Sequence, residues 1–182
     1  MKSSAARRAF VVVACCVAST VSASHIQPAS ADPWAPVRFL VGTWEGTSSG
    51  RPGDGTVRRE YRLVLRDRFI EVWNSSTYPP QERNPKGERH EDVGYISYDR
   101  NRQTFVLRQF HVEGFVNTYV AAPDVSKAIV FTSEAVENIP AGWRARETYA
   151  ALGPDRFEEV FELAEPSKAF EVYTRARFKR AQ

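Results

Sequence analysis

Apolar and polar residues alternate with a period of two along most of the chain from residue 43 onward, a pattern typical of strands with one buried face. The alternation predicts ten strands, over 43–49, 57–66, 68–75, 93–98, 104–112, 115–121, 128–136, 143–152, 157–164 and 170–178. Short connections such as Arg66-Asp67-Arg68 are typical of hairpins, whereas the longer connections 77–91 and 137–142 are expected at a mouth. We therefore predict an all-β protein, built as a single up-and-down antiparallel β-barrel of about ten strands.

The first 38 residues lack this alternation. The first 23 of them have the pattern of a secretory signal peptide and therefore predict export. Basic residues up to Arg8 precede an uncharged stretch over 9–23, whose last three residues are small enough for signal peptidase. We predict a secretory signal peptide over 1–23, with a second acceptable cut after Ala31, and a Pro-, Ala- and Ser-rich leader over 24–38. The barrel domain then occupies 39–182. Arg7-Arg8 resembles a twin-arginine signal, so the protein is expected in the periplasm or secreted, without stable membrane insertion.

The charge balance changes once the predicted signal peptide is set aside. The chain has 25 Lys and Arg against 22 Asp and Glu, and three of the basic residues precede Ser24, which leaves 22 against 22. Nucleic-acid-binding proteins usually carry a basic excess, so DNA and RNA are not expected partners. Both cysteines, Cys15 and Cys16, lie in the signal peptide, so the exported domain should have neither a disulfide nor a cysteine metal site.

The first predicted strand opens with Gly42-Thr43-Trp44-Glu45-Gly46, after a lead-in that contains prolines. The glycine allows a close backbone approach, and the tryptophan ring can close the foot of a barrel. Together with about ten strands, this opening resembles the calycin superfamily, which includes lipocalins and fatty-acid-binding proteins. The segment from Gly50 to Gly55 is too short for the two helices of the latter, so the chain is most similar to nitrobindin-like ten-stranded barrels. The resemblance implies a closed barrel that holds a small ligand.

The resemblance also implies haem, because nitrobindin-like proteins hold haem through a histidine near the end of the chain. This sequence has no histidine after His111, so that ligand cannot be carried over. His25 and His90 lie in polar stretches and are expected to be solvated. His111 is in phase with Gln109 and the apolar residues of its strand, where it could ligate iron or move a proton. No cofactor and no metal ion are otherwise expected.

Ionisable residues on the apolar face of a strand indicate a lined cavity, because an apolar core has no reason to bury them. Glu71, Arg108 and Glu147 each lie in phase with the apolar residues of a predicted strand, and so does Glu159. Taken singly, such residues are more often solvent-exposed or ion-paired than functional, and nearby aromatic residues are at least as often part of ordinary core packing. The predicted ligand-binding residues are Trp44, Tyr61, Glu71, Trp73, Tyr95, Arg108, His111, Glu147 and Tyr149.

These patterns predict an exported barrel that binds a small, partly hydrophobic molecule in its lumen, with Glu71, Arg108 and Glu147 holding its polar end. No catalytic residues are assigned, because the sequence has no phosphate-binding loop, serine nucleophile elbow or His-Glu-x-x-His motif. Three alternatives stay open. The first is a barrel enzyme that uses inner Glu, Arg and Tyr residues for acid–base chemistry on a small organic acid, and the second is a haem-binding barrel. The third is a barrel with a solid interior that acts only through its outer surface or loops.

Overall fold

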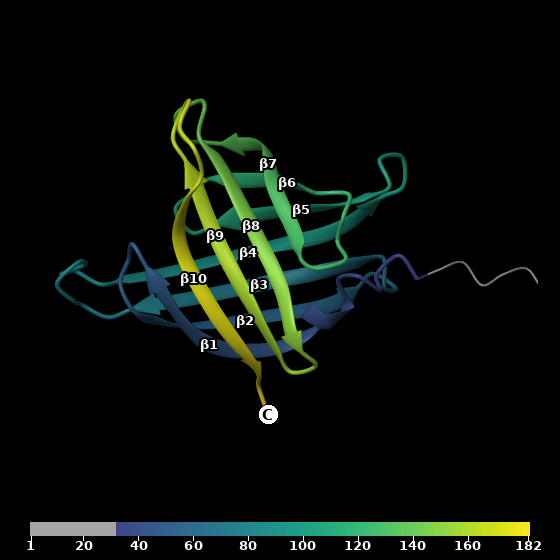
Figure 1. Cartoon of the computed structure of the whole chain (residues 1–182), viewed down its shortest axis with the longest axis horizontal. Coiled ribbons are helices and arrows are strands. Elements are labelled where there is room, and N and C mark those ends of the chain that lie inside the picture. The colour runs from purple at the N-terminus through teal and green to yellow at the C-terminus, as the bar shows by residue number, and fades with distance from the viewer. Residues whose placement is uncertain (1–31) are drawn as a thin grey trace, which may run out of the picture. The chain divides into compact units, whose positions relative to one another are not determined.

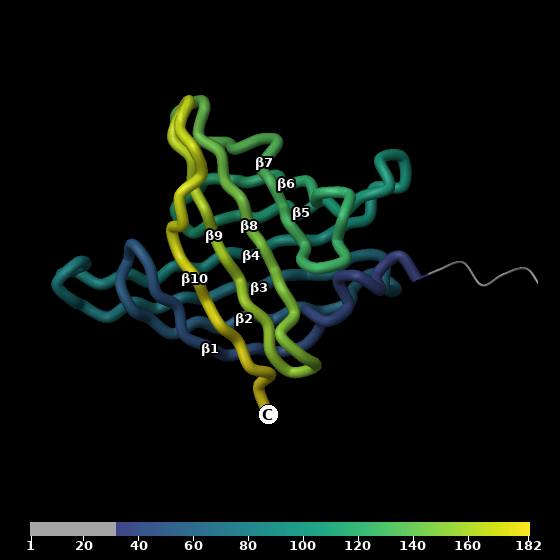
Figure 2. Tube along the Cα trace, viewed as in Figure 1, coloured from purple at the N-terminus to yellow at the C-terminus, as the bar shows by residue number. Residues whose placement is uncertain are grey.

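In the computed structural model, which describes residues 32–182, ten antiparallel strands form one closed barrel (Figures 1 and 2). The strands are β1 (Gly42–Gly50), β2 (Gly55–Val64), β3 (Phe69–Tyr78), β4 (Glu88–Asp99), β5 (Thr104–His111), β6 (Val116–Ala121), β7 (Ile129–Glu137), β8 (Arg144–Gly153), β9 (Arg156–Ala164) and β10 (Glu171–Arg180). Each strand pairs with its neighbours in sequence, and β1 pairs with β10. The predicted all-β, up-and-down barrel is therefore confirmed.

The Gly-x-Trp segment lies where β1 and β10 close the barrel. The antiparallel register places Trp44 opposite Arg180 and Gly46 opposite Phe178. A Cβ atom on Gly46 would come within 2.1 Å of the Arg177 carbonyl oxygen. Because only glycine permits this close approach of two backbones, the second glycine of the segment is needed for closure.

Large apolar side chains fill one end of the barrel. The 3₁₀ turn η1 (Arg38–Leu40) precedes β1, and the Trp44 indole N–H donates a 2.6 Å hydrogen bond to the Leu40 carbonyl. The Phe157 ring lies edge-on to Trp44, with ring centroids 4.9 Å apart, and stacks on Phe178 at 4.5 Å. These rings belong to the buried hydrophobic core of the barrel.

The structure differs from the predicted leader over 24–38 in its last residues. Trp34 and Val37 are buried in the core, and the Trp34 indole N–H donates to the Asp67 carbonyl over 3.0 Å. Packed structure therefore begins before residue 39. The signal peptide predicted over 1–23 lies outside the described residues. Within residues 32–182, the structure contains no helix long and apolar enough to cross a membrane.

Two strands extend further than the alternation predicts. β3 continues to Tyr78 and β4 already begins at Glu88, so the connection predicted over 77–91 shrinks to 79–87. His90 was expected to be solvated, and this expectation is wrong. It belongs to β4, and its side chain lines the interior of the barrel.

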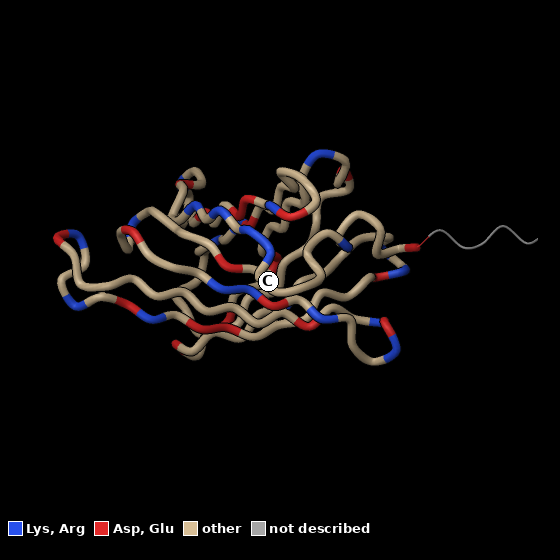
Figure 3. The backbone as a smooth tube through the Cα atoms, turned by 90° about the horizontal axis from the view of Figure 1, so that it is seen from below, with Lys and Arg blue, Asp and Glu red and all other residues tan. Residues whose placement is uncertain are grey.

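Acidic and basic positions are interspersed along the strands, as the view in Figure 3 shows. On the outer face, for example, Glu158 accepts hydrogen bonds from Arg175 over 2.6 Å and from Arg177 over 3.1 Å. Exposed pairs of this kind contribute only about 0–1 kcal/mol each. The stability of the barrel therefore depends mainly on its interior.

Candidate ligand-binding site

A cavity of about 530 Å³ lies inside the barrel, beyond the aromatic core. This volume falls within the range of roughly 300–1,000 Å³ that small-molecule sites occupy. The side of the cavity formed by β7, β8, β9 and the loop between β7 and β8 is largely apolar; its apolar lining residues are Val136, Ile139, Pro140, Trp143, Ala145, Phe161 and Leu163. The side formed by β2 to β6 is polar. The cavity therefore presents an amphipathic environment to a ligand.

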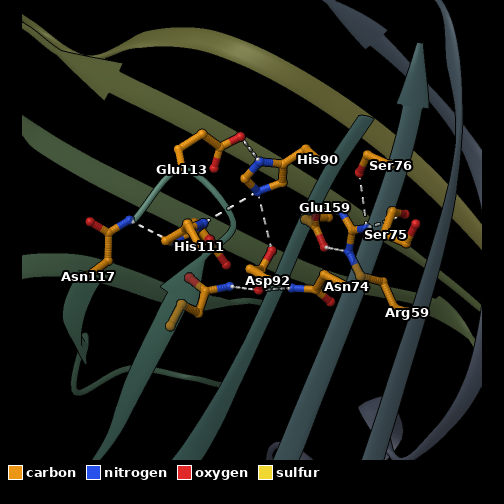
Figure 4. A network of polar contacts seen from close by, with 12 residues as sticks. Arg59, Asn74, Ser75, Ser76, His90, Asp92, His111, Glu113, Asn117 and Glu159 are labelled. Atoms are coloured by element: carbon orange, nitrogen blue, oxygen red, sulfur yellow. Dashed lines mark hydrogen bonds and ion pairs between the residues drawn. The ribbon is translucent and has the colours of Figure 1, made fainter. Parts of the chain in front are cut away.

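Four polar side chains form one row across the polar side. Arg59 on β2 lies opposite Asn74 on β3, Asn74 lies opposite Asp92 on β4, and Asp92 lies opposite His111 on β5. All four line the cavity, and we call them the polar belt (Figure 4). Inward-facing positions recur at every second residue of a strand, so this row depends on four strands keeping one register.

At one end of the polar belt, Arg59 forms a buried ion pair with Glu159 on β9. Two hydrogen bonds join the side chains, from Nη2 to Oε1 over 2.7 Å and from Nε to Oε2 over 3.1 Å. Nη1 also donates to the Ser75 carbonyl and to the Ser76 hydroxyl. Burial alone would lower the pKa of Arg59, but the Glu159 carboxylate raises it above its usual value. Arg59 is therefore permanently charged, and the pair ties β2 to β9 across the barrel.

A second carboxyl group, that of Glu147 on β8, lies near this ion pair. Burial, with repulsion from Glu159, raises the pKa of Glu147 to about 8. Tyr149 donates a hydrogen bond from its hydroxyl to Glu147 Oε2. Glu147 is thus protonated at neutral pH, and a protonated carboxyl group can both donate and accept a hydrogen bond.

At the other end of the polar belt, His90 and His111 lie beside Asp92. His90 Nε2 is 3.5 Å from Asp92 Oδ2 and 3.3 Å from His111 Nδ1, and His90 Nδ1 is 2.9 Å from Glu113 Oε1. Burial lowers the pKa of His90, but the hydrogen bonds to Asp92 and Glu113 outweigh it and raise the value to about 9. Burial lowers the pKa of His111 to about 4. At neutral pH His90 is therefore charged and His111 is neutral.

Several buried polar atoms around the polar belt have no hydrogen-bond partner within the described residues. They are Tyr61 Oη, Asn74 Oδ1, Gln109 Oε1 and Asn117 Oδ1. Leaving a buried polar group unpaired costs about 1–3 kcal/mol, so native proteins rarely do so without a reason. Three of the four atoms are amide oxygens, which accept hydrogen bonds. A bound molecule that offers donors would satisfy them.

Five of the nine predicted site residues face the interior. Trp44, Tyr61 and Tyr149 are buried in the aromatic core, whereas His111 and Glu147 line the cavity itself. The structure thus brings His111 and Glu147 to one space, as their phases on the strands indicated.

The other four residues, Glu71, Trp73, Tyr95 and Arg108, lie on the outer face, and their predicted inward orientation is wrong. Tyr95 is 41% exposed and donates to Glu71 over 3.1 Å, and Glu71 accepts a 2.6 Å hydrogen bond from Arg62. Arg108 is exposed as well. The reason is that β3, β4 and β5 turn the alternate set of residues inward, and these strands carry apolar residues on both faces.

Of the four residues of the polar belt, only His111 is among the site residues predicted from the sequence. Arg59 is in phase with Val57 and Tyr61, so the alternation itself contained the signal. Asn74 and Asp92 gave no such signal, because the predicted phase of β3 turns Asn74 outward and the predicted fourth strand begins only at residue 93, after Asp92. Cross-strand register, which the sequence does not state, brings these residues together.

A closed ten-stranded barrel with a ligand-sized, amphipathic cavity defines the class of calycin-like, ligand-binding barrels. Within this class, the chain belongs to the family described as the THAP4-like, heme-binding beta-barrel domain, which matches residues 34–180. No curated protein sequence matches the chain.

Solved structures with the same architecture include Rv2717c from M. tuberculosis, with a TM-score of 0.64 and 15% sequence identity over 84% of this chain and 99% of that one. At this identity the likeness shows the fold alone. Two designed proteins are more distant. A redesigned beta barrel has a TM-score of 0.44 at 9% identity over 81% of this chain and 96% of that one. A de novo designed, fluorescence-activating beta barrel has a TM-score of 0.42 at 15% identity over 79% of this chain and 95% of that one.

The family description names haem, but the residues around the cavity fit it poorly. Of the β10 residues that face the interior, Thr174, Ala176 and Phe178 do not ligate haem iron, which leaves Tyr173 as the one residue of this strand that lines the cavity and is of a haem-ligating type. A porphyrin is too large to enter beside His111, because Nδ1 lies 3.3 Å from His90 Nε2, Nε2 lies 3.2 Å from the Asn117 amide, and the ring stacks on Phe115 at 4.0 Å. The cavity lining also includes several carboxylates, which would repel the two haem propionates.

Proposed function

We propose that this protein is an exported binding protein whose barrel holds a small, partly hydrophobic molecule. The observation that carries the proposal is the cavity of about 530 Å³ with one apolar and one polar side. The apolar side would cover the hydrophobic part of the molecule, and the polar belt would contact its polar end. Export rests on the signal peptide predicted from the sequence over 1–23.

The charges around the cavity favour a neutral or cationic polar end. With Glu147 protonated, the cationic side chains are Arg59, His90 and Arg144, and the anionic ones are Glu88, Asp92, Glu113 and Glu159. The lining therefore carries one more negative than positive charge, which disfavours an anionic head group. The unpaired amide oxygens of Asn74, Gln109 and Asn117 favour a head group that donates hydrogen bonds.

Nile red, a neutral apolar dye, tests the cavity directly. We expect saturable 1:1 binding with a fluorescence increase. Ala145→Trp should abolish it, because Ala145 is buried and lines the cavity. Ala150→Trp places the same side chain on the outer face of β8 and should leave binding unchanged. Equal affinity in wild type and Ala145→Trp, with both proteins folded by circular dichroism, would refute the proposal. If Ala145→Trp abolishes dye binding as expected, native mass spectrometry of the purified wild-type protein would identify the natural ligand by its mass.

Acid–base catalysis is a second candidate function, favoured by the raised pKa of Glu147. A carboxyl group that titrates near neutrality is suited to proton transfer, and Tyr149 donates a hydrogen bond to it. If the identified ligand turns over, Glu147→Gln should abolish turnover while dye binding stays intact. Loss of both together would instead assign Glu147 to binding.

Haem binding through His111 is the remaining alternative, and it has a spectroscopic test. Addition of haem to the purified protein should give no Soret shift if the cavity excludes the cofactor. A shift that is present in the wild type and lost in His111→Ala would overturn that expectation and assign haem to this cavity.

A further inference from the structure

We propose that His90, Asp92 and His111 bind a divalent first-row transition-metal ion such as Zn²⁺. The three residues lie on the adjacent strands β4 and β5 and line the cavity. One donor atom from each side chain lies within 4.8 Å of the other two. Two imidazole nitrogens and one carboxylate oxygen suit Zn²⁺ and Fe²⁺ better than Ca²⁺ or Mg²⁺, which prefer oxygen ligands alone.

Two of the three spacings between the donor atoms match what a tetrahedral ion needs. Zinc binds nitrogen and oxygen ligands at about 2.0–2.2 Å, so two ligands at a tetrahedral angle are about 3.3–3.5 Å apart. His90 Nε2 lies 3.3 Å from His111 Nδ1 and 3.5 Å from Asp92 Oδ2. An ion between these atoms would replace two direct contacts between side chains with coordinate bonds and would release the Nε2 proton of charged His90 to solvent, with little movement of the backbone.

The atoms that do not face the proposed ion already have fixed partners. His90 Nδ1 lies 2.9 Å from Glu113 Oε1, and Asp92 Oδ1 accepts hydrogen bonds from Asn74 over 2.8 Å and Gln109 over 3.2 Å. Figure 4 shows these contacts. Histidine ligands in metal sites usually donate their second N–H to a carboxylate or carbonyl, which fixes the ring. His90 Nε2 and Asp92 Oδ2 are thereby left to point at the ion.

The position of Asn117 also favours metal binding at His111. An ion on His111 Nδ1 leaves the proton on Nε2, which then needs an acceptor. The Asn117 amide lies 3.2 Å from Nε2, and its oxygen Oδ1 is buried without a partner within the described residues. A half-turn of this amide brings Oδ1 to both His111 Nε2–H and the Tyr119 hydroxyl, which can donate. Asn117 is therefore placed to accept the Nε2 proton that an ion on Nδ1 would fix.

Three protein ligands leave a fourth coordination position, and because all three residues line the cavity, this position would face it. Open sites of this kind hold water or a donor atom of a bound molecule in the fourth position. The metal site does not require the small-molecule ligand of the proposed function, so each can be tested without the other.

The test is a cobalt and zinc titration of the full chain, purified without a polyhistidine tag and with Cys15→Ser and Cys16→Ser to remove competing thiols. We expect one equivalent of Co²⁺ to give the strong visible bands of a tetrahedral site, and one equivalent of Zn²⁺ to remove them. Isothermal titration calorimetry gives the affinity. Absence of tetrahedral bands at one equivalent in this otherwise wild-type chain would overturn the proposal, whatever the variants do.

Matched variants assign the ligands. Loss of a residue that only hydrogen-bonds to a metal ligand weakens metal binding by about 10–100-fold. His111→Ala and Asp92→Asn each remove a ligand itself and should weaken Zn²⁺ binding by more than this. Glu113→Gln removes only the hydrogen-bond partner of His90 and should weaken it by about 10-fold. Glu91→Gln removes an adjacent carboxylate of β4, and His25→Ala removes the histidine that precedes the described residues; neither should change binding. Unchanged affinity in folded His111→Ala would refute the assignment. Nile red binding without metal would leave the proposed function intact in that case.

Discussion

Replacing Glu147 with glutamine should stabilise the protein, by an amount that grows with pH. Glu147 is 7% exposed, and burial together with repulsion from Glu159 raises its pKa from 4.5 to about 8. Between these two pH values the folded chain keeps a proton on Glu147 that the unfolded chain releases. The free energy of unfolding of the wild type therefore falls as pH rises through this window. Glutamine does not titrate, so the free energy of unfolding of the variant does not fall for this reason.

The magnitude follows from the size of the shift. One pKa unit corresponds to about 1.4 kcal/mol, so at pH 7 the shift from 4.5 costs the wild type about 3 kcal/mol. Below pH 4 the carboxyl group is protonated in both states, and the pH-dependent difference vanishes. The titratable and charged groups around Glu147 are common to both proteins, so their own titration largely cancels; they are Arg59, Tyr61, Asp92, Tyr119, Tyr149 and Glu159.

The assay is urea-induced unfolding of both proteins at intervals from pH 4 to pH 8. The stability gain of Glu147→Gln should rise steadily across this range. Glu45→Gln, which neutralises an exposed carboxylate on β1, should change the free energy of unfolding by less than about 0.5 kcal/mol at every pH. A gain that stays flat or decreases with pH would show that Glu147 is ionised in the folded barrel.

Three further changes probe the framework around the site. Arg59→Met leaves Glu159 buried without a partner and should cost about 3–5 kcal/mol in urea unfolding, whereas adding Glu159→Leu should recover most of it. Gly46→Ala places a Cβ 2.1 Å from the Arg177 carbonyl oxygen and should lower the free energy of unfolding by at least about 2 kcal/mol, because β1 and β10 must separate. Phe157→Ala removes the central ring of the core and should cost about 3–5 kcal/mol, measured by thermal denaturation at fixed pH. Wild-type stability in any one of them would contradict the packing described for that residue.

The number and order of strands were readable from the sequence because alternation and short turns are local properties. The orientation of several strands was not. On β4 and β5, Val93 and Phe110 are 46% and 48% exposed although both are large and apolar. When both faces of a strand carry such residues, alternation cannot say which face turns inward, and Glu71 and Arg108 were placed on the wrong side for this reason.

The sequence by itself determined a barrel of ten antiparallel strands, the position of Trp44 at its closed end, and the inward positions of His111 and Glu147. It did so because each of these follows from the period of a single strand or from one short segment. The tertiary structure alone decided which charges meet. His90 and His111 are 21 residues apart and Arg59 and Glu159 are 100 apart. Only the register of strands around a closed barrel brings such pairs within hydrogen-bonding distance, and no local pattern encodes that register.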